Sequence, residues 1–325
     1  MASLPDFRLA HPQSAAAAVA LRAENPASRF IAGGTDLLPN IRRGLATPEV
    51  LIDLGGVGEL REFRASANTL RLGAGVTLAT IAADASVQKR LPALAQAALA
   101  VAGPTHRTAA TLGGNLCLDT RCQYYNQSEP WREGNQFCMK LAGDVCRVAP
   151  KSARCYAAFS GDVAPALLAL AATVEILGPQ GLRRLPIRDF YRDDGLACLA
   201  LAADEMLLAV EVPWQDGWTS TYDKVRIRGA IDFPLVGVAV ALRREGDRVG
   251  ELRIACTGVS SRPEFIDGLE PLFGKPLDDA ALALVDKRIL KCTQPMETTI
   301  ISVPYRRRVM PVLARKLLKG LWEEG

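Results

Sequence analysis

The segment from residue 103 to residue 160 constrains the fold more than any other part of this sequence. It is rich in Cys, Asn, Gln, Gly, Arg and aromatic residues and has almost no helical or strand periodicity. Irregular segments of this length are uncommon inside compact domains unless something holds them together. The sequence therefore predicts that a bound group organises this segment.

Five of the eight cysteines of the chain fall in this segment, namely Cys117, Cys122, Cys138, Cys146 and Cys155. The other three stand singly among apolar or mixed neighbours, as small buried side chains do. The N-terminal alanine-rich stretch is flanked by Asp6, Arg8, Arg22 and Glu24, which favours an amphipathic helix over a secretory signal. We therefore expect a cytoplasmic protein with reduced thiols, not four disulfides.

Four of the clustered cysteines have the spacing C-x15-C-x7-C-x8-C: Cys122, Cys138, Cys146 and Cys155. Four thiolates suit either a tetrahedral zinc ion or an iron–sulfur cluster. Zinc sites favour close C-x2–4-C pairs, and none occurs among these four. The spacing alone does not identify the metal. Aromatic and basic neighbours either shield a cluster or form a small core of their own: Arg121, Tyr124, Tyr125, Trp131, Phe137, Arg147 and Arg154.

Short strands and helices alternate on both sides of the irregular segment. The patterns predict helices at residues 14–22, 78–83, 91–101 and 163–171, and strands at residues 29–32, 50–54, 69–75, 173–177 and 206–212. The last third predicts antiparallel strands at residues 222–228, 235–243 and 252–257, followed by helices. Pro213 closes a strand and marks the expected boundary between a domain of residues 1–213, with an insertion at 118–160, and a domain of residues 214–325.

Charge and hydropathy exclude several classes of partner. The net charge of +4 is small for 325 residues and gives no reason to expect nucleic acid. No apolar run of 18 residues is present, so we expect no membrane span. The two histidines, His11 and His106, have no nucleophile–base partner motif, so we predict no catalytic residue in this chain. His106 precedes a glycine loop and is expected to be structural or to lie near a bound phosphate.

Two glycine loops are candidates for binding a phosphate: Ala32-Gly33-Gly34-Thr35-Asp36-Leu37 and Thr111-Leu112-Gly113-Gly114-Asn115. Glycines allow successive backbone N–H groups to approach an anion closely. Neither loop has the G-x-G-x-x-G or G-x-x-x-x-G-K-[ST] pattern. Each loop alone is more often a simple turn.

The pair A-G-G-T-D and T-x-G-G-N, about 80 residues apart, resembles the FAD-binding medium subunits of the molybdenum hydroxylase family, which includes carbon monoxide dehydrogenase and xanthine dehydrogenase. The resemblance spans essentially the whole chain. It implies an α+β fold: a vanillyl-alcohol-oxidase (PCMH)-type FAD-binding domain in two subdomains, and an antiparallel-sheet-and-helix C-terminal domain of the CO dehydrogenase flavoprotein type. It also implies that both glycine loops grip the FAD pyrophosphate, through Ala32, Gly33, Gly34, Thr35, Asp36, Leu37, Thr111, Gly113, Gly114 and Asn115.

Three further positions are similar to cofactor-binding residues of that family. Asp162 resembles an aspartate on the ribityl or ribose side, Leu207 a residue lining the flavin ring, and Lys224 a lysine near the ring. Plainer interpretations stay open, because Asp162 can cap a helix, Leu207 can pack a core strand, and Lys224 can be a solvated charge.

The insertion between Asn115 and Asp162 resembles that of the 4-hydroxybenzoyl-CoA reductase branch of the family. That resemblance implies a [4Fe–4S] cluster on the four spaced cysteines, with Cys117 left to the flavin loop. It also implies an (αβγ)2 enzyme with a molybdenum-binding large subunit and a [2Fe–2S] small subunit. Electrons would pass from ferredoxin through the cluster and FAD towards molybdenum.

Two other interpretations remain. One is a hydroxylase medium subunit that exports electrons to an outside acceptor. The other is a structural or assembly protein with zinc in the loop. The cysteine insertion separates the reductase from the ordinary hydroxylase, and iron and flavin absorbance separate both from a zinc protein.

Overall fold

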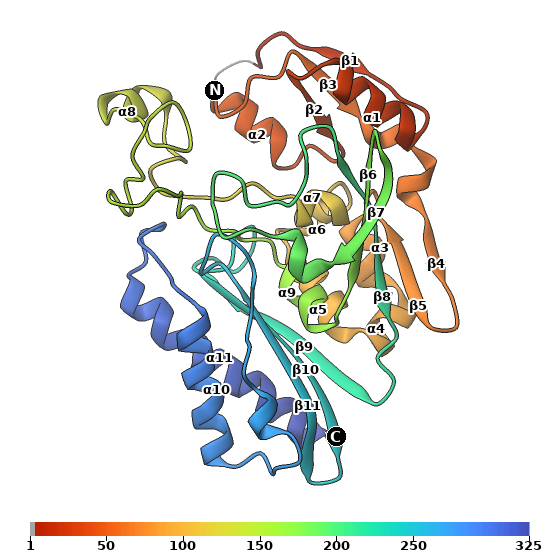
Figure 1. Cartoon of the computed structure of the whole chain (residues 1–325), viewed down its shortest axis with the longest axis vertical. Helices are drawn as coiled ribbons and strands as arrows, with labels where there is room; N and C mark the ends of the chain where they lie inside the picture. Colours follow the sequence, from red (N-terminus) through yellow and green to blue (C-terminus); the bar gives the residue numbers. More distant parts are fainter. Residues whose placement is uncertain (1–3, 325) are drawn as a thin grey trace.

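The computed structural model describes residues 4–324, which form three sheets and eleven α-helices (Figure 1). The sheets follow one another along the long axis of the molecule, with the N-terminal strands at one end and α11 near the other. No helix in this described range combines the length and hydrophobicity that crossing a membrane requires.

The first sheet is parallel, with the order β1-β3-β2, and it positions the first glycine loop. Its strands and helices are β1 (Arg8–Ala10), α1 (Ala15–Glu24), β2 (Ser28–Ile31), α2 (Leu37–Arg42) and β3 (Val50–Asp53). Ser14 caps α1, because its hydroxyl accepts a hydrogen bond from Ala17 N at 3.1 Å. The glycine loop lies between the end of β2 and the start of α2.

The second sheet is antiparallel, with the order β4-β5-β8-β6-β7. Its strands are β4 (Phe63–Ala65), β5 (Thr69–Gly73), β6 (Thr173–Gly178), β7 (Gly181–Pro186) and β8 (Met206–Pro213). The helices of this part of the chain are α3 (Leu78–Ala83), α4 (Ala85–Arg90), α5 (Pro92–Ala100) and α9 (Val163–Ala169). The 3-10 turns are η1 (Leu54–Gly56), η2 (Gly58–Arg61) and η3 (Ile187–Phe190). These elements enclose the largest apolar core of the chain.

The C-terminal sheet has the order β12-β11-β10-β9 and is covered on both faces. Its elements are β9 (Trp218–Val225), β10 (Val236–Glu245), β11 (Arg248–Thr257), β12 (Glu264–Phe265), η4 (Glu270–Leu272), α10 (Asp279–Cys292) and α11 (Val303–Glu324). The helices α10 and α11 pack on one face. Small alanines of α5 and α9 pack on the other face, so this sheet is attached to the preceding domain through a close-packed alanine layer.

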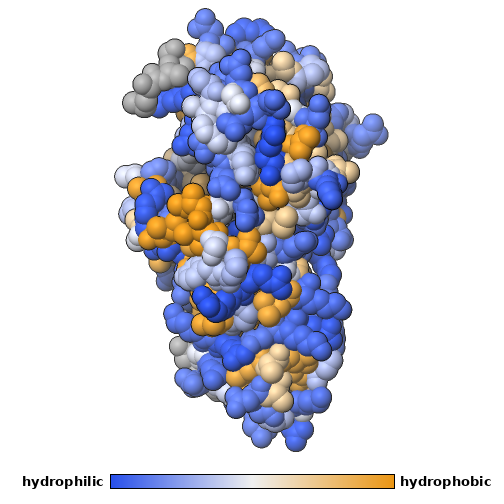
Figure 2. Space-filling model, turned by 90° about the vertical axis from the view of Figure 1, so that its left-hand side faces the viewer, coloured by the Kyte–Doolittle hydropathy of each residue, from blue (hydrophilic) through white to orange (hydrophobic). Residues whose placement is uncertain are grey.

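The irregular segment contains three short helices, α6 (Pro104–Arg107), α7 (Leu112–Leu116) and α8 (Glu129–Gly134). The insertion closes on itself, because Arg121 and Ala158 exchange two backbone hydrogen bonds of 2.7 Å. The loop with α8 projects from one side of the molecule (Figure 1). Figure 2 views this side and shows hydrophobic side chains gathered at mid-height between hydrophilic regions.

The structure confirms the predicted fold class and most predicted elements. The helix expected at residues 78–83 has those bounds, whereas the helix expected at 163–171 ends at Ala169. The strand expected at 222–228 is displaced towards the N-terminus, since β9 spans Trp218–Val225. The sequence patterns missed four strands, β1, β4, β7 and β12. One of them, β7, is exposed along nearly its whole length, so it lacks the alternating burial that marks a strand.

Candidate functional site

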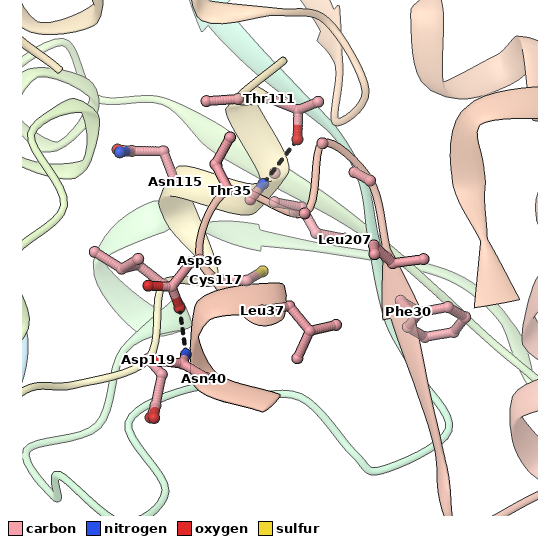
Figure 3. Close-up of a pocket in the computed structure, with 18 of the residues that line it drawn as sticks. Phe30, Thr35, Asp36, Leu37, Asn40, Thr111, Asn115, Cys117, Asp119 and Leu207 are labelled. Atoms are coloured by element: carbon pink, nitrogen blue, oxygen red, sulfur yellow. Dashed lines mark hydrogen bonds between the residues drawn. The ribbon is translucent and has the colours of Figure 1, made fainter. Parts of the chain in front are cut away.

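A cavity of about 1520 Å³ lies between the two glycine loops. Pockets for drug-sized ligands are usually about 300–1,000 Å³, so this one has room for a ligand of dinucleotide size. Every predicted cofactor residue lines it except Lys224. Figure 3 shows residues of both loops in the lining of this cavity: Thr35, Asp36 and Leu37 from the first loop, and Thr111 and Asn115 from the second.

Gly33 is the point at which the two glycine loops touch. A Cβ atom at this position would lie 1.9 Å from the carbonyl oxygen of Ala109, two residues before Thr111. Only glycine permits so close an approach between two backbones. The two motifs therefore form one unit, and the first loop is held in place by the segment that leads into the second.

The first glycine loop presents backbone donors that the protein itself does not use. Among residues 4–324, no group accepts a hydrogen bond from the N–H of Gly33, Gly34, Thr35 or Asp36. Consecutive free amides that precede a helix form an anion-binding nest. His106 also lines the cavity, and its buried Nδ1 has no hydrogen-bond partner in the described structure. These features fit a ligand that carries phosphate groups.

The second glycine loop begins α7 and is fixed by its own hydrogen bonds. Thr111 Oγ1 accepts a hydrogen bond from Gly114 N at 3.1 Å (Figure 3), and Gly113 N donates to Ala74 O at 2.7 Å. The side chain of Asn115 accepts from Val163 N at 3.0 Å and so caps α9. Asn115 therefore joins the loop to α9, whereas the side chain of Asp162, at the N-cap position, makes no capping bond.

Arg121 forms an ion pair with the carboxylate of Asp36, whose side chain is partly exposed. Its guanidinium pairs with Asp36 Oδ1 and donates to Asn40 Oδ1 at 2.8 Å. Asn40 Nδ2 in turn donates to Asp36 Oδ2 at 2.9 Å (Figure 3). Burial raises the pKa of Asp36, and the charge of Arg121 opposes that rise. A residue near the start of the insertion, Arg121, thus anchors the first glycine loop.

Asp162 lies at the centre of a buried polar group on the other side of the cavity. Its Oδ1 is 2.8 Å from Lys224 Nζ and accepts a hydrogen bond from the Tyr222 hydroxyl at 2.7 Å. Lys224 Nζ also donates to Asp232 O at 3.0 Å. Burial raises the pKa of Asp162, and Lys224 opposes that rise. Lys224 is therefore a buried charge behind Asp162, not a solvated one.

The sequence analysis missed Tyr222, although a signal was present. Tyr222 and Lys224 are two residues apart on β9, so their side chains lie on the same face of the strand. Tyr222 can therefore contact the same group as Lys224, and both contact Asp162. The other predicted residue from a strand, Leu207 of β8, is buried and lines the cavity.

Cys117 and the four spaced cysteines lie in different surroundings. Cys117 lines the cavity, together with Cys198, and burial raises its pKa to about 12. None of the four spaced cysteines is part of that lining, and all four are buried.

The four spaced cysteines are electrostatic neighbours. Burial raises the pKa of Cys122 to about 12, and the nearby Cys155 and Cys138 add to the rise. Burial likewise raises the pKa of Cys155 to about 11, with contributions from Cys146 and Cys138 and an opposing effect of Lys140. Four buried thiols near one another are a donor set of the type that binds zinc or an iron–sulfur cluster.

The backbone around Cys138 is tightly wound. Gln136, Phe137 and Ala142 all have left-handed φ angles of 52–64°, which cost free energy unless the surroundings impose them. The Cys138 carbonyl accepts hydrogen bonds from both Leu141 N and Gly143 N. No three His, Cys, Asp or Glu side chains in the described range converge as ligands of a single ion would. The four thiols of the described structure are therefore close together but are not arranged as the ligands of one metal ion.

Comparisons with known proteins agree with this architecture. Residues 5–215 match the family described as FAD binding domain in molybdopterin dehydrogenase, and residues 220–321 match the CO dehydrogenase flavoprotein C-terminal domain. The chain is 33% identical to the aldehyde oxidoreductase FAD-binding subunit PaoB of Escherichia coli (strain K12), over 89% of this chain and 91% of PaoB. It is 29% identical to the carbon monoxide dehydrogenase medium chain of Hydrogenophaga pseudoflava, over 98% of each chain. A chain of the solved carbon monoxide dehydrogenase from that organism superposes with a TM-score of 0.81 at 25% identity, covering 99% of both chains.

Proposed function

The chain belongs to the FAD-binding subunits of the molybdopterin dehydrogenases, and on this premise we propose that it binds FAD between its two glycine loops and serves as an electron-transfer subunit of a molybdenum enzyme. The observation that carries the proposal is the cavity of about 1520 Å³ bordered by the free amides of Gly33 to Asp36. FAD supplies the capacity to accept and release electrons singly or in pairs, and the protein supplies binding and electrostatics.

The residues around the cavity have separate roles in this proposal. The amides of the first glycine loop, with the hydroxyls of Thr35 and Thr111, bind the pyrophosphate. His106, whose buried Nδ1 is unpaired in the described structure, donates to a phosphate or ribose oxygen. Asp162 accepts from the ribityl or ribose side, held in place by Tyr222 and Lys224. Leu207 packs against the flavin ring.

We propose that the partners are a large molybdenum-binding subunit and a small [2Fe–2S] subunit, in an (αβγ)2 assembly located in the cytoplasm. The Hydrogenophaga relative is named a medium chain, which supports a multi-subunit enzyme. The hydrophobic side chains gathered on the face with the insertion (Figure 2) also support a subunit contact, because soluble proteins rarely expose contiguous apolar surface without a partner.

We propose further that Cys122, Cys138, Cys146 and Cys155 hold a [4Fe–4S] cluster. Their burial, their electrostatic proximity and the strained backbone at Cys138 support a group that this loop encloses. The loop closes at the Arg121–Ala158 bridge, next to the flavin-binding cavity. Iron, unlike zinc, would let this loop exchange electrons with FAD.

Two candidate reactions follow. In the first, the complex is a 4-hydroxybenzoyl-CoA reductase, and electrons pass from reduced ferredoxin through the cluster and FAD towards molybdenum, where 4-hydroxybenzoyl-CoA loses its phenolic hydroxyl to give benzoyl-CoA. The cysteine insertion supports this candidate. In the second, a molybdenum hydroxylase exports electrons through FAD to an outside acceptor. The 33% identity to an aldehyde oxidoreductase subunit favours this candidate.

The test uses the complete purified complex. Iron and flavin analysis is combined with EPR of the dithionite-reduced complex, and Cys138→Ser is compared with Cys117→Ser. We expect Cys138→Ser to lose four irons and keep FAD, and Cys117→Ser to keep both. If the native complex contains only the iron of two [2Fe–2S] clusters, the [4Fe–4S] assignment is wrong. Zinc bound in place of iron would do the same.

Steady-state assays then separate the two reactions. A reductase oxidises a reduced low-potential dye only when 4-hydroxybenzoyl-CoA is present. A hydroxylase of the aldehyde-oxidising kind reduces an acceptor dye when an aldehyde is supplied. Absence of bound FAD in the native complex would contradict the proposed function as a whole.

A further inference from the structure

Three residues lie between the flavin-binding cavity and the four spaced cysteines: Asp119, Tyr125 and Lys140. All three line the cavity. They come from the segment that also carries the four cysteines, since Tyr125 follows Cys122 by three residues and Lys140 follows Cys138 by two. We call these three residues the shared wall.

Tyr125 joins the two sites by direct packing. Its side chain is buried and belongs to the same apolar cluster as Cys122 and Cys155. Its backbone N–H donates to Cys122 O at 3.1 Å, and its hydroxyl donates to Asp119 Oδ2 at 3.1 Å. One ring therefore contacts the cysteine cluster and borders the cavity.

Lys140 carries a buried positive charge and connects the residues of the shared wall. Its side chain is 6% exposed, and its Nζ is 2.9 Å from Asp119 Oδ1. The same ammonium donates to Thr120 Oγ1 at 2.7 Å and to Gly195 O at 2.6 Å. It lies 5.1 Å from the centre of the Tyr125 ring, within the range of a cation–π contact. All three donors of the ammonium are used, so its position is set.

The placement of this ion pair is not explained by stability. Buried ion pairs contribute little to stability relative to apolar residues of the same volume, because both charges lose their hydration. The side chain of Asp119 is 39% exposed and that of Lys140 only 6%, so solvent screens the carboxylate more than the ammonium. Within the protein, the field of the buried ammonium therefore outweighs that of its partner.

We propose that Lys140 is a positioning residue for electron transfer: it ties the cysteine loop to the flavin-binding cavity and places one positive charge between the two redox groups. The proposal rests on the FAD and the cluster of the proposed function. Reduction makes each group more negative, so a nearby positive charge stabilises the reduced form of both. Lys140 thereby raises the two potentials together and keeps them matched.

The experiment compares Lys140→Met with Lys151→Met in the complete complex. Methionine keeps an unbranched side chain that is one atom shorter and removes the charge. Lys151 is an exposed lysine in the same loop, so its variant has the same change in net charge. FAD and iron per complex are measured first, and redox titrations then follow the flavin by absorbance and the cluster by EPR.

For Lys140→Met we expect both potentials to become more negative, with the equilibrium constant for reduction falling about tenfold at each group. For a one-electron couple, tenfold corresponds to about 59 mV. Lys151→Met is expected to leave both potentials in place, because solvent and salt screen an exposed charge. The proposal is overturned if Lys140→Met retains FAD and iron but shifts neither potential or only one of them.

Asp119→Asn provides a second variant whose expected effect has the opposite sign. It removes the partial compensation of Lys140, so both potentials should become more positive. If Lys140→Met does not retain FAD or iron, the test is the direction of the shift in Asp119→Asn. Potentials of Asp119→Asn that stay unchanged or become more negative then overturn the proposal. Native complex that holds FAD but no cluster contradicts the proposed function instead, and that outcome is visible before any variant is titrated.

Discussion

Replacement of Gly33 by alanine tests whether the two glycine loops form one unit. The new Cβ atom would lie 1.9 Å from Ala109 O and 2.4 Å from Ala109 C. Both are backbone atoms, so no side chain can turn away to make room. The contact must open by about 1.5 Å before the new methyl group reaches ordinary van der Waals distance.

The cost of that opening can be bounded. Overpacking of a close contact costs about 1–3 kcal/mol, and occasionally more. The opening moves the free amides of the first loop away from the second loop, so the strain falls on the conformation that binds FAD. Since about 1.4 kcal/mol is a factor of ten in affinity, FAD affinity should fall about 5- to 150-fold.

The assay is a titration of FAD-depleted chain with FAD, followed by flavin fluorescence, with the melting temperature of both forms measured alongside. Gly58→Ala is the matched control, because nothing lies within 4 Å of a Cβ atom there. We expect the control to bind FAD as the native chain does. Gly33→Ala with native affinity and an unchanged melting temperature would refute the reasoning.

Three further predictions concern buried charges. Lys224→Met leaves Asp162 buried without its cation, so the free energy of unfolding should fall by about 3–5 kcal/mol in denaturant titrations at pH 8; an unchanged midpoint would contradict the pairing. Burial raises the pKa of Glu264 from 4.5 to about 7. Its stabilising contribution is therefore complete below about pH 4.5 and lost as the pH rises towards 7. At pH 8, Glu264→Gln should exceed native stability by on the order of 3 kcal/mol and lose that advantage near pH 4, as a thermal-melt pH series would check. Arg306, fully buried, donates to the carbonyl oxygens of Leu235, Met296 and Gly258; Arg306→Met should lower the melting temperature by several degrees, because those acceptors lose their donor, whereas exposed Arg307→Met should not.

The predictable part of the fold is the part whose signal is local. α3 has the predicted bounds, and its signals are local: apolar residues recur at helical spacing, and the structure shows Thr77 capping its first turn. Both glycine loops could be recognised because each is a short contiguous motif. Strand β7 could not, since its residues face solvent and show no alternation.

The role of single site residues was less accessible to sequence reasoning. Asp162 was expected to cap α9, but the side chain of Asn115 performs that task, which leaves the carboxylate free to meet Tyr222 and Lys224. Arg121 was expected either to shield a cluster or to belong to a small core of the insertion, and the structure pairs it with Asp36. In each case the partner lies between about 45 and 85 residues away in the chain.

The sequence by itself determined the family resemblance, the order of the elements, the paired glycine motifs and the separation of Cys117 from the four spaced cysteines, because each depends on neighbouring residues. Only the tertiary structure decided that Gly33 rests against Ala109, that Lys224 lies behind Asp162, and that Lys140 lines the cavity beside the Tyr125 ring. Those arrangements depend on how distant segments pack together. Packing depends on the summed contacts of the whole core, so no local pattern encodes it.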